Sequence, residues 1–453
     1  MVDDEANRFS ARAARYARVG ANIGGVAARM AGARLMGNNG RNGDHAAALS
    51  TALGGLKGPL MKVAQLMATI PDLLPPEFAD ELQKLQSDAP PMGAAFVRRR
   101  MVAELGPDWQ SRFASFDLKP SAAASLGQVH QARAHDGEKL ACKLQYPDMA
   151  SAVEADLSQL DILFKLRRRM DNSIDSTQIA EEIGARIREE LDYRHEAKNA
   201  ALYQAMLGKS GLVRVPQLRP ELSTQRLLTM QWLEGKKLLD YKGASLETRN
   251  DIGRAMFHAW WYPFSTFGVI HGDPHLGNYT VFEEDGVPRG INLLDYGCVR
   301  IFPAQFVNAV VDLYKGLRDD NQQQIAHAYE VWGFKNLRPD LIEVLNLWAK
   351  FIFGPLLDDR VRTIADGVKP SAYGRAEVYK VHQELKRKGP VLVPREFVFM
   401  DRAAIGLGGV FLHLDARLNF YQIFNEMIEN FDVNTVAERQ SSLLQQVGLQ
   451  AAN

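Results

Sequence analysis

Helix-like hydrophobic runs separated by short breaks make up the first 115 residues. The run LKGPLMKVAQLMATI (56–70) is typical of a helix and ends at Pro71, and the run PPEFADELQKLQSD (75–88) starts with prolines and early carboxylates, as helix N-termini do. The stretches NNGRNGDH (38–45) and APPMG (89–93) combine Asn, Gly or Pro and break the pattern. The pattern predicts a mostly helical N-terminal segment.

Near residue 116 the helical hydrophobic pattern gives way to alternating polar and apolar residues. The segment 116–147 carries Asp136-Gly137, a pair typical of a β-hairpin turn. The pattern further along first predicts a charged helical tract over about 149–206, interrupted near 171–176, and then strands within 212–218 and 226–235. From about residue 238 it predicts a mainly helical remainder with one hairpin over 279–297. This order predicts an α+β protein with a small β-rich lobe, a larger helical lobe and a helical preface.

The length of 453 residues exceeds that of one ordinary domain, so we expect several. The changes in composition and hydrophobic pattern predict four segments: an Arg/Ala-rich arm over 1–45, a helical extension over 46–115, a β-rich lobe over 116–234 and a helical lobe over 235–453. Residues 8–41 carry seven Arg and no Asp or Glu. We expect either an element that lies on an anionic membrane surface or a solvated arm. A cleaved transit peptide is a third interpretation, which Asp3, Asp4 and Glu5 disfavour.

Composition narrows the functional classes. Lys and Arg number 54, as do Asp and Glu, so no bulk nucleic-acid binding is expected. Two cysteines exclude a disulfide framework and suit a reducing compartment. The longest uncharged run, 255–272, contains His, Pro, Ser and Thr and predicts a buried helix, not a membrane span. Since the acidic start MVDDEAN is atypical of a secretory signal, we expect a cytoplasmic protein, or one peripheral to the inner face of a membrane.

The strongest chemical signal is HGDPHLGN (271–278), followed by LLDYG (293–297). Asp273 and Asn278 have the D-x-x-x-x-N spacing of a kinase catalytic loop, and Asp295, 22 residues beyond Asp273 (295 − 273), stands where a carboxylate chelates Mg²⁺. Phosphoryl transfer needs hard oxygen ligands for Mg²⁺ and a carboxylate near the attacking oxygen. The alternative is a loop of capping Asp and Asn residues.

A strand lysine precedes these motifs. Lys143 stands in LACK, where kinases place the lysine that pairs with phosphates and with a helix carboxylate. Three carboxylates of the predicted helical tract are candidates for that partner. Asp192 and Glu196 are four residues apart and are expected on one helical face, with Glu190 about a half-turn away. Spacing does not choose between them, and each could instead be a surface residue paired with a neighbouring Arg or Lys.

An Ala-rich stretch, PSAAASLGQVH (120–130), occupies the place of a glycine-rich phosphate loop. Alanine methyl groups would stiffen such a loop and alter its approach to phosphates, or the run could simply start a helix. The stretch after RLLT is in the position of an interlobe hinge. The residues predicted to contact the nucleotide are Ala123, Ala124, Ser125, Gln128, Lys143, Met230 and Trp232.

Together these residues resemble the UbiB (AarF-domain, ADCK) family of protein-kinase-like proteins, which is linked to coenzyme Q biosynthesis. The resemblance runs from about residue 50 to about residue 430. It rests on AAASLGQVH (122–130), LACK (140–143), ELD (190–192), HGDPHLGN (271–278) and DYG (295–297). The Ala-rich loop discriminates, because small-molecule kinases share the last two motifs.

The resemblance implies a protein-kinase-like bilobal fold with a helical N-terminal extension. Lys62 and Gln65 match the family's KxGQ motif, with Ala64 in place of its Gly, and would lie over the active site. Glu190 and Asp192 match the ExD motif that approaches that lysine.

The catalytic roles implied by the resemblance are residue-specific. Glu196 matches the helix carboxylate that pairs with Lys143. Asp273 matches the catalytic-loop aspartate, and Asn278 and Asp295 match the metal ligands.

The implied function is Mg-ATP binding and hydrolysis that supports ubiquinone biosynthesis. Quinone-pathway enzymes or lipid quinone intermediates would be the partners, and a membrane surface would be reached peripherally. One alternative is a small-molecule phosphotransferase of the aminoglycoside or choline kinase type, which does not account for KVAQ (62–65) or AAASLGQVH. The other is a nucleotide-binding pseudokinase scaffold, which has no need of every catalytic group.

Overall fold

The computed structural model describes residues 92–124, 126–147, 187–365, 374–388 and 394–450, with scattered residues at 149–151, 153, 154, 157, 184, 185 and 368. The helices predicted over 56–70 and 75–88 lie outside this part of the chain. The rest divides into two compact units, and residues 196–217 and 233–453 belong to the second.

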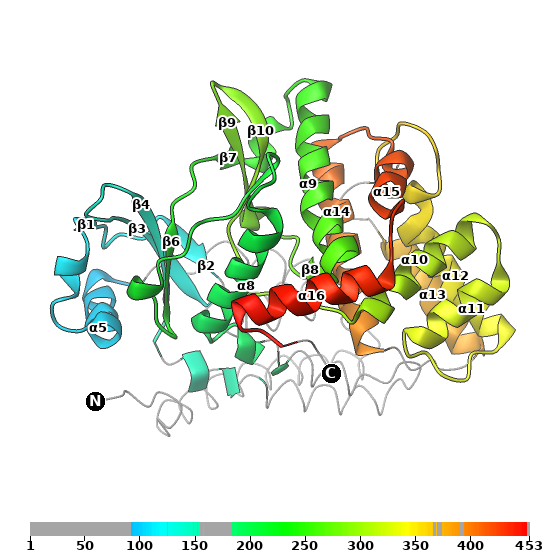
Figure 1. The fold of residues 1–453 in the computed structure, drawn as a ribbon, viewed down its shortest axis with the longest axis horizontal. Coiled ribbons are helices and arrows are strands. Elements are labelled where there is room, and N and C mark those ends of the chain that lie inside the picture. Colours follow the sequence, from blue (N-terminus) through cyan, green and yellow to red (C-terminus); the bar gives the residue numbers. More distant parts are fainter. Residues whose placement is uncertain are drawn as a thin grey trace, which may run out of the picture. The chain divides into compact units, whose positions relative to one another are not determined.

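The first unit is built on a five-stranded antiparallel sheet with the order β1-β3-β4-β6, in which β2 also pairs with β3 (Figure 1). The strands are β1 (Ser115–Phe116), β2 (Ala122–Ala124), β3 (Gly127–Arg133), β4 (Lys139–Gln145) and β6 (Leu227–Gln231). The predicted hairpin is confirmed, because β3 and β4 flank a turn in which Gly137 has a φ of 91° and Asp136 accepts the N–H of Glu138. The Ala-rich run forms strand β2 and does not start a helix.

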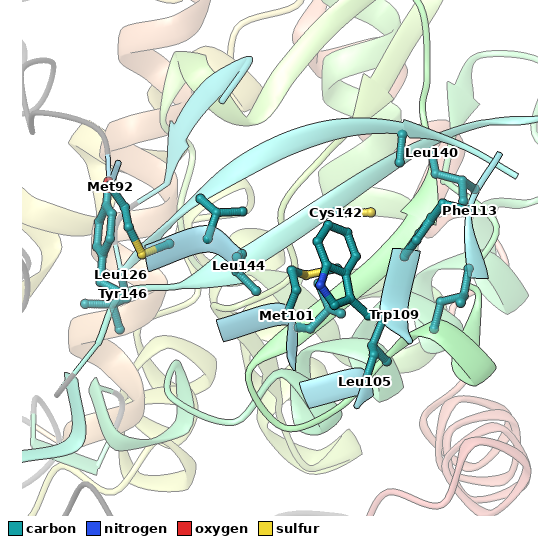
Figure 2. Close-up of a cluster of buried hydrophobic side chains, with 14 of the residues drawn as sticks. Met92, Met101, Leu105, Trp109, Phe113, Leu126, Leu140, Cys142, Leu144 and Tyr146 are labelled. Carbon is teal, nitrogen blue, oxygen red and sulfur yellow. The ribbon is translucent and has the colours of Figure 1, made fainter. Parts of the chain in front are cut away.

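The core of this unit lies between the sheet and the segment that precedes it (Figure 2). Helix α5 (Ala94–Leu105) turns Val97, Met101 and Leu105 inward, at the spacing of one helical face. The short helix η3 (Trp109–Arg112) adds Trp109, whose ring meets Phe116 edge-on at 5.2 Å between centroids. Burying these side chains stabilises the packing of α5 on the sheet.

A buried charge fastens the end of α5 to the turn before β6. The Glu104 side chain is 5% exposed, and its two oxygens accept bonds from Arg226 Nε at 2.7 Å and Thr224 Oγ1 at 2.6 Å. Arg100 Nη1 lies 3.8 Å from the same carboxylate. Because the carboxylate is removed from water, it depends on these partners.

The second unit holds a four-stranded sheet, a two-stranded ribbon and a set of helices. The sheet has the order β5-β10-β9-β7, with β5 (Val213–Arg214), β7 (Lys236–Lys237), β9 (Tyr279–Glu284) and β10 (Val287–Leu293). The ribbon pairs β8 (Val269–His271) with β11 (Val299–Ile301). The predicted hairpin over 279–297 is confirmed by the antiparallel pairing of β9 with β10.

Most of this unit is helical (Figure 1). Its helices are α8 (Tyr193–Leu207, from Glu196 on), α9 (Leu246–Phe267), α10 (Ala304–Arg318), α11 (Gln322–Val331), α12 (Pro339–Phe353), α13 (Arg375–Lys388), α14 (Arg395–Leu414), α15 (Phe420–Ile428) and α16 (Val433–Val447). Its short helices among the described residues are η5 (Leu238–Tyr241), η6 (Leu276–Asn278) and η7 (Gly354–Leu356), whereas η4 (Pro220–Leu222) belongs to the first unit.

Helix α9 confirms the buried helix predicted from the uncharged run 255–272. Ser245 caps its start by accepting the N–H of Thr248, and Phe257, Trp260 and Phe264 are buried. Helices α14, α15 and α16 pack on α9. Within the described ranges, we find no helix with both the length and the apolar composition needed to cross a membrane.

The helical tract predicted over 149–206 is wrong at one point, because the chain turns at residues 190–192. Helix α8 begins only at Tyr193, and the Asp192 side chain accepts the N–H of Arg194 at 3.0 Å. An Asp that bonds the first backbone N–H groups of a helix favours a start there over continuation. Asp192 and Glu196 therefore do not share a helical face.

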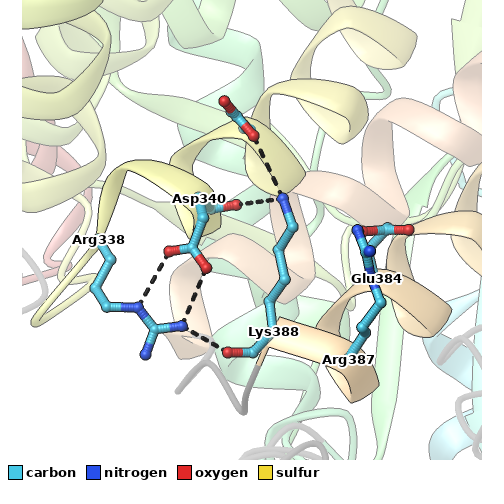
Figure 3. Close-up of polar contacts among 6 residues, drawn as sticks. Arg338, Asp340, Glu384, Arg387 and Lys388 are labelled. Carbon is cyan, nitrogen blue, oxygen red and sulfur yellow. Dashed lines mark hydrogen bonds and ion pairs between the residues drawn. The ribbon is translucent and has the colours of Figure 1, made fainter.

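A charged cluster joins the start of α12 to the end of α13 (Figure 3). Arg338 donates to both carboxylate oxygens of Asp340 and to the carbonyl of Lys388, and Lys388 Nζ donates back to the carbonyl of Asp340. Exposed pairs of this kind contribute at most about 1 kcal/mol each, so the cluster orients two helix ends and supplies little stability.

Candidate functional site

Helix α9 leads directly into the predicted catalytic loop. Gly268 follows the helix with a φ of 66°, a left-handed conformation that glycine adopts without penalty. The chain then enters β8, which ends at His271, two residues before Asp273. The partner strand β11 starts at Val299, four residues after Asp295. One short ribbon therefore carries both predicted carboxylates.

His271 links the two motifs from within the ribbon. Its Nε2 lies 2.7 Å from the carbonyl oxygen of Asp295, and its Nδ1 lies 3.3 Å from the backbone nitrogen of Asp273. A carbonyl only accepts and a backbone N–H only donates, so Nε2 carries the proton and Nδ1 accepts. The buried His271 thus joins the backbone at Asp273 to the backbone at Asp295.

Asn278 ends the short helix η6, directly before β9. Its Nδ2 donates to the carbonyl of Asp273 at 3.0 Å, and its own backbone carbonyl accepts the N–H of Leu294 at 3.0 Å. The amide nitrogen is therefore used inside the loop, which makes the side-chain oxygen the atom suited to a metal ion. The bonds also keep Asn278 beside both Asp273 and the strand that leads to Asp295.

Helix α8 clamps the DYG segment by the backbone of its central residue. Glu196 Oε1 accepts the N–H of Tyr296 at 3.4 Å, and Asn199 Nδ2 donates to the carbonyl of Tyr296 at 3.0 Å. Both side chains are buried, and they are three residues apart on one helical face. Asp295 itself accepts the N–H of Gly297 at 3.0 Å, which orients its carboxylate. The conformation of this segment therefore depends on α8.

Three buried tyrosines surround these groups. Burial raises the pKa of Tyr203, Tyr279 and Tyr296 well above the ordinary value, so their hydroxyls stay protonated. The Tyr296 hydroxyl donates to the carbonyl of Leu293 at 2.8 Å. The Tyr203 ring packs against Tyr296 at 5.6 Å. These rings shield the ribbon from water without adding charge.

Helix α14 borders the catalytic loop on another side. A Cβ atom at Gly406 would lie 2.1 Å from Cγ of Pro274, the residue after Asp273. No side chain fits there, so glycine lets α14 pack directly on the loop.

The first unit holds the predicted phosphate-binding lysine. Lys143 lies in the middle of the sheet, opposite Val129 of β3 and Leu228 of β6, and is 5% exposed. Its Nζ lies 5.2 Å from the centroid of the Tyr193 ring, a cation–π arrangement. Tyr193 directly follows the ExD segment, so the structure brings Lys143 and that segment together.

A further bond holds the ExD segment against β4. Gln145, two residues beyond the lysine, donates its Nε2 to the carbonyl of Leu191 at 3.1 Å. Glu190 is buried in the same unit. Glu196 belongs to the second unit, so its pairing with Lys143 stays a prediction.

The Ala-rich strand β2 pairs with β3, which separates it from the strand that carries this lysine. Ala123 pairs with Gln128 and Ala124 with Gly127, whose missing Cβ would lie 2.3 Å from the carbonyl oxygen of Leu144. The Gln128 side chain turns into the unit, where Oε1 accepts the N–H of Met92 at 2.7 Å and Nε2 lies 2.9 Å from His130 Nε2. Gln128 thus serves the packing of the unit.

The predicted hinge residues lie at the C-terminal end of strand β6. Met230 is buried and pairs with Ala141, and the Trp232 N–H donates to the carbonyl of Lys139 at 2.8 Å. A contact of Trp232 with adenine would therefore use its carbonyl. Lys62, Gln65 and Ser125 lie outside the described residues.

Sequence reasoning missed His271, Asn199 and Gly406 as parts of this site. His271 adjoins the Gly-Asp of its motif, and that position was the one available signal. Asn199 and Gly406 stand in ordinary helical sequence, and only the packing of α8 and α14 shows what they contact.

The donor set fits a magnesium ion bound with a nucleotide. Among the described residues, no group of three His, Cys, Asp or Glu side chains could hold a metal ion by itself. Asn278 and Asp295 offer hard oxygen atoms, and Mg²⁺ takes about six such ligands, most of them from phosphates and water. A site of this composition would form only together with a phosphate ligand.

A β-rich unit with a buried strand lysine, and a helical unit with the Asp, Asn and Asp of two adjacent loops, define a kinase-like class of protein. The sequence matches the ABC1 atypical kinase-like domain over residues 84–329, more than half of the chain. The chain belongs to this family, which confirms the fold predicted from the sequence.

Curated relatives carry kinase names. The chain is 30% identical to "Atypical kinase COQ8, mitochondrial" of Saccharomyces cerevisiae over 58% of this chain and 53% of that protein. It is 31% identical to "AarF domain-containing protein kinase 1" of Xenopus tropicalis over 62% of this chain and 55% of that protein. The chain thus spans about half the length of these relatives.

A solved structure has the same fold. It is described as the complex of Rv3197 with erythromycin from Mycobacterium tuberculosis, is 26% identical, and covers 88% of this chain and 98% of its own with a TM-score of 0.58. Its coverage extends the likeness beyond the residues that the family domain matches.

Proposed function

We propose that this protein binds Mg-ATP and hydrolyses it, or transfers its terminal phosphoryl group, in support of ubiquinone biosynthesis. The observation that carries the chemistry is the ribbon of the second unit, in which His271 joins the backbones of Asp273 and Asp295. The relatives named as COQ8 kinases support the pathway.

In this proposal each group has one task. Lys143 orients the phosphates, and Asp295 with the Oδ1 atom of Asn278 would hold Mg²⁺. When bound, the ion would neutralise part of the negative charge of the phosphates. Asp273 lies in the loop to hold the proton of water or of another acceptor, and Glu196 keeps the DYG segment in place through Tyr296.

The membrane and the pathway enzymes are the proposed partners. We propose that the protein associates peripherally with the inner face of a membrane, where lipid quinone intermediates reside. Lys62 and Gln65, with Glu190 and Asp192, are proposed to restrict access to the nucleotide, as the family motifs imply.

The test compares Asp295→Asn with Asp285→Asn. Asp285 has a φ of 53° in the turn between β9 and β10, a position that Asn tolerates, so the control makes the same change in the hairpin that precedes Asp295. At 100 times the dissociation constant, Mg-ATP should stabilise the wild type and the control by about 2.7 kcal/mol. Asp295→Asn should lose that stabilisation. Undiminished stabilisation in Asp295→Asn would refute the metal assignment.

A cellular experiment tests the pathway. Cells lacking the protein should lose ubiquinone, and wild type and Asp285→Asn should restore it while Asp295→Asn should not. Restoration by Asp295→Asn would favour the scaffold alternative. Unchanged quinone in the deletion strain would contradict the pathway assignment.

A soluble small molecule is the second candidate acceptor. The solved relative is described in complex with erythromycin, which supports the ability of this fold to take a small ligand. Incubation with Mg-[γ-³²P]ATP and a cell extract should yield no labelled soluble metabolite if the quinone assignment holds. A labelled metabolite that requires Asp273 would favour a phosphotransferase.

A further inference from the structure

The C-terminal helix α16 lies outside the matched family domain, which ends at residue 329. The helix has well-formed ends: Asp432 accepts the N–H of Thr435 at its start, and Gly448 closes it in a left-handed conformation. One face packs on α9 and α10. Two polar contacts connect it to the elements that carry the candidate site.

The first contact is made by Gln440, a buried residue in the middle of α16. Its Nε2 donates to the carbonyls of Phe267 at 2.7 Å and Phe302 at 2.8 Å. Phe267 precedes β8 by two residues, and Phe302 directly follows β11. The side-chain amide of Gln440 therefore bridges the segment that enters β8 and the segment that leaves β11. A Cβ at Gly268 would lie 2.5 Å from this Nε2, so the glycine permits the approach.

The ribbon needs such support because it is short. Three residue pairs join β8 to β11, and the backbone bonds from Phe302 to Gly268 and from Gly272 to Cys298 add one link at each end. An isolated two-stranded ribbon is marginal at best in water. The positions of Asp273 and Asp295, at its other end, depend on its register.

The second contact reaches α8. Lys198 Nζ donates to the carbonyl of Gly448 at 2.9 Å, at the C-terminal end of α16, where the helix dipole favours a cation. Lys198 stands between Glu196 and Asn199, the two residues that hold Tyr296 of the DYG segment. Figure 1 shows α16, drawn in red, running beside α8 and the base of α9.

We infer that α16 is a positioning element of the candidate active site, with Gln440 as the positioning residue that sets the register of the β8–β11 ribbon. Lys198 is its second attachment point, on the helix that holds the DYG segment. The catalytic consequence rests on the proposed nucleotide chemistry, whereas the structural consequence does not.

Two variants of Gln440 and one control variant elsewhere on α16 test the role of Gln440. Gln440→Met keeps the shape and removes the donor, and Gln440→Lys offers an ammonium group that can donate to both carbonyls. Gln446→Met makes the first change at an exposed position of the same helix and serves as the control. Turnover of ATP and amide hydrogen exchange are measured at a temperature where circular dichroism shows each variant to be folded.

We expect Gln440→Met to exchange the amides of Gly272 and Phe302 at least tenfold faster than wild type, and Gln446→Met to leave them unchanged. We expect kcat to fall at least tenfold in Gln440→Met, with KM for ATP changed less than twofold. Gln440→Lys should recover most of both losses. A purely structural role would lower thermal stability without lowering kcat in the folded protein.

Two results would overturn the inference: unchanged amide exchange in Gln440→Met, or faster exchange with unchanged kcat in an active enzyme. If wild type hydrolyses no nucleotide and exchange still rises in Gln440→Met, the proposed function fails while the ribbon contact stands. If Gln440→Met does not fold, Lys198→Met replaces it, with the exposed Lys209→Met as its control. Lys198→Met should then accelerate exchange at Tyr296, and unchanged exchange there would refute the role of α16.

Discussion

Replacing Gly406 by Ala should disturb the catalytic loop from a helix that carries none of its motifs. The added Cβ would lie 2.1 Å from Cγ of Pro274 and 3.3 Å from its Cβ and Cδ atoms. Three atoms of the ring would therefore lie closer to the new Cβ than ordinary van der Waals contact at 3.4 Å. The ring also fixes the backbone φ, so relief requires movement of the loop or of α14.

The size of the shift follows from the contact distance. Ordinary van der Waals contact begins at 3.4 Å, so the gap must open by about 1.3 Å (3.4 − 2.1). If the loop moves, Asp273 moves with it, and a displacement of about 1 Å can cost about 100-fold in rate. If α14 moves, overpacking should cost about 1–3 kcal/mol, or roughly 2–4 °C in Tm per kcal/mol for a unit of this size.

The assay measures kcat for ATP hydrolysis and Tm on the same preparations, with Gly409→Ala as the control. Gly409 lies on α14, and a Cβ there would meet nothing within 4 Å. Both variants gain the helix propensity of alanine, about 1 kcal/mol, so the difference between them isolates the contact with Pro274. The reasoning is refuted if Gly406→Ala matches Gly409→Ala in both kcat and Tm.

Three further outcomes are expected. Asn199→Leu removes the donor to the buried carbonyl of Tyr296, which should lower the free energy of unfolding by about 1–3 kcal/mol and weaken stabilisation by Mg-ATP. Equal urea midpoints for wild type and Asn199→Leu would contradict this. Glu104→Gln should destabilise the first unit by about 3–5 kcal/mol in urea, while the more exposed Glu138→Gln should cost about 1 kcal/mol or less, and similar losses would argue against the buried pair. Burial lowers the pKa of His130 from its usual value, so below about pH 6.5 the unfolded chain takes up the proton before the folded unit does. The contribution to stability should therefore be present well above that pH and be lost as the pH falls through about 6.5 toward the lower folded pKa, and His130→Gln should show a smaller fall; identical pH dependences would exclude this contribution.

Local sequence was sufficient where short-range chemistry decides the structure. The Asp136-Gly137 pair specified a hairpin turn, and the uncharged run of α9 could be buried only in protein because its His and Pro suit no lipid. HGDPHLGN and DYG place Asp273, Asn278 and Asp295 beside short strands, since each motif is a loop whose bonds close within a few residues.

Tertiary structure decided which distant residues serve that loop chemistry. Nothing in the sequence near Asn199 indicates that it bonds the carbonyl of Tyr296, 97 residues away. Gln440 reaches Phe267 across 173 residues. The break at residues 190–192 was also missed, because helix propensity favoured continuation while the cap at Asp192 favoured a start. Sequence by itself determined the groups that can do chemistry, because their spacing is local; packing decided what holds them, because those contacts join parts of the chain whose separation carries no periodic signal.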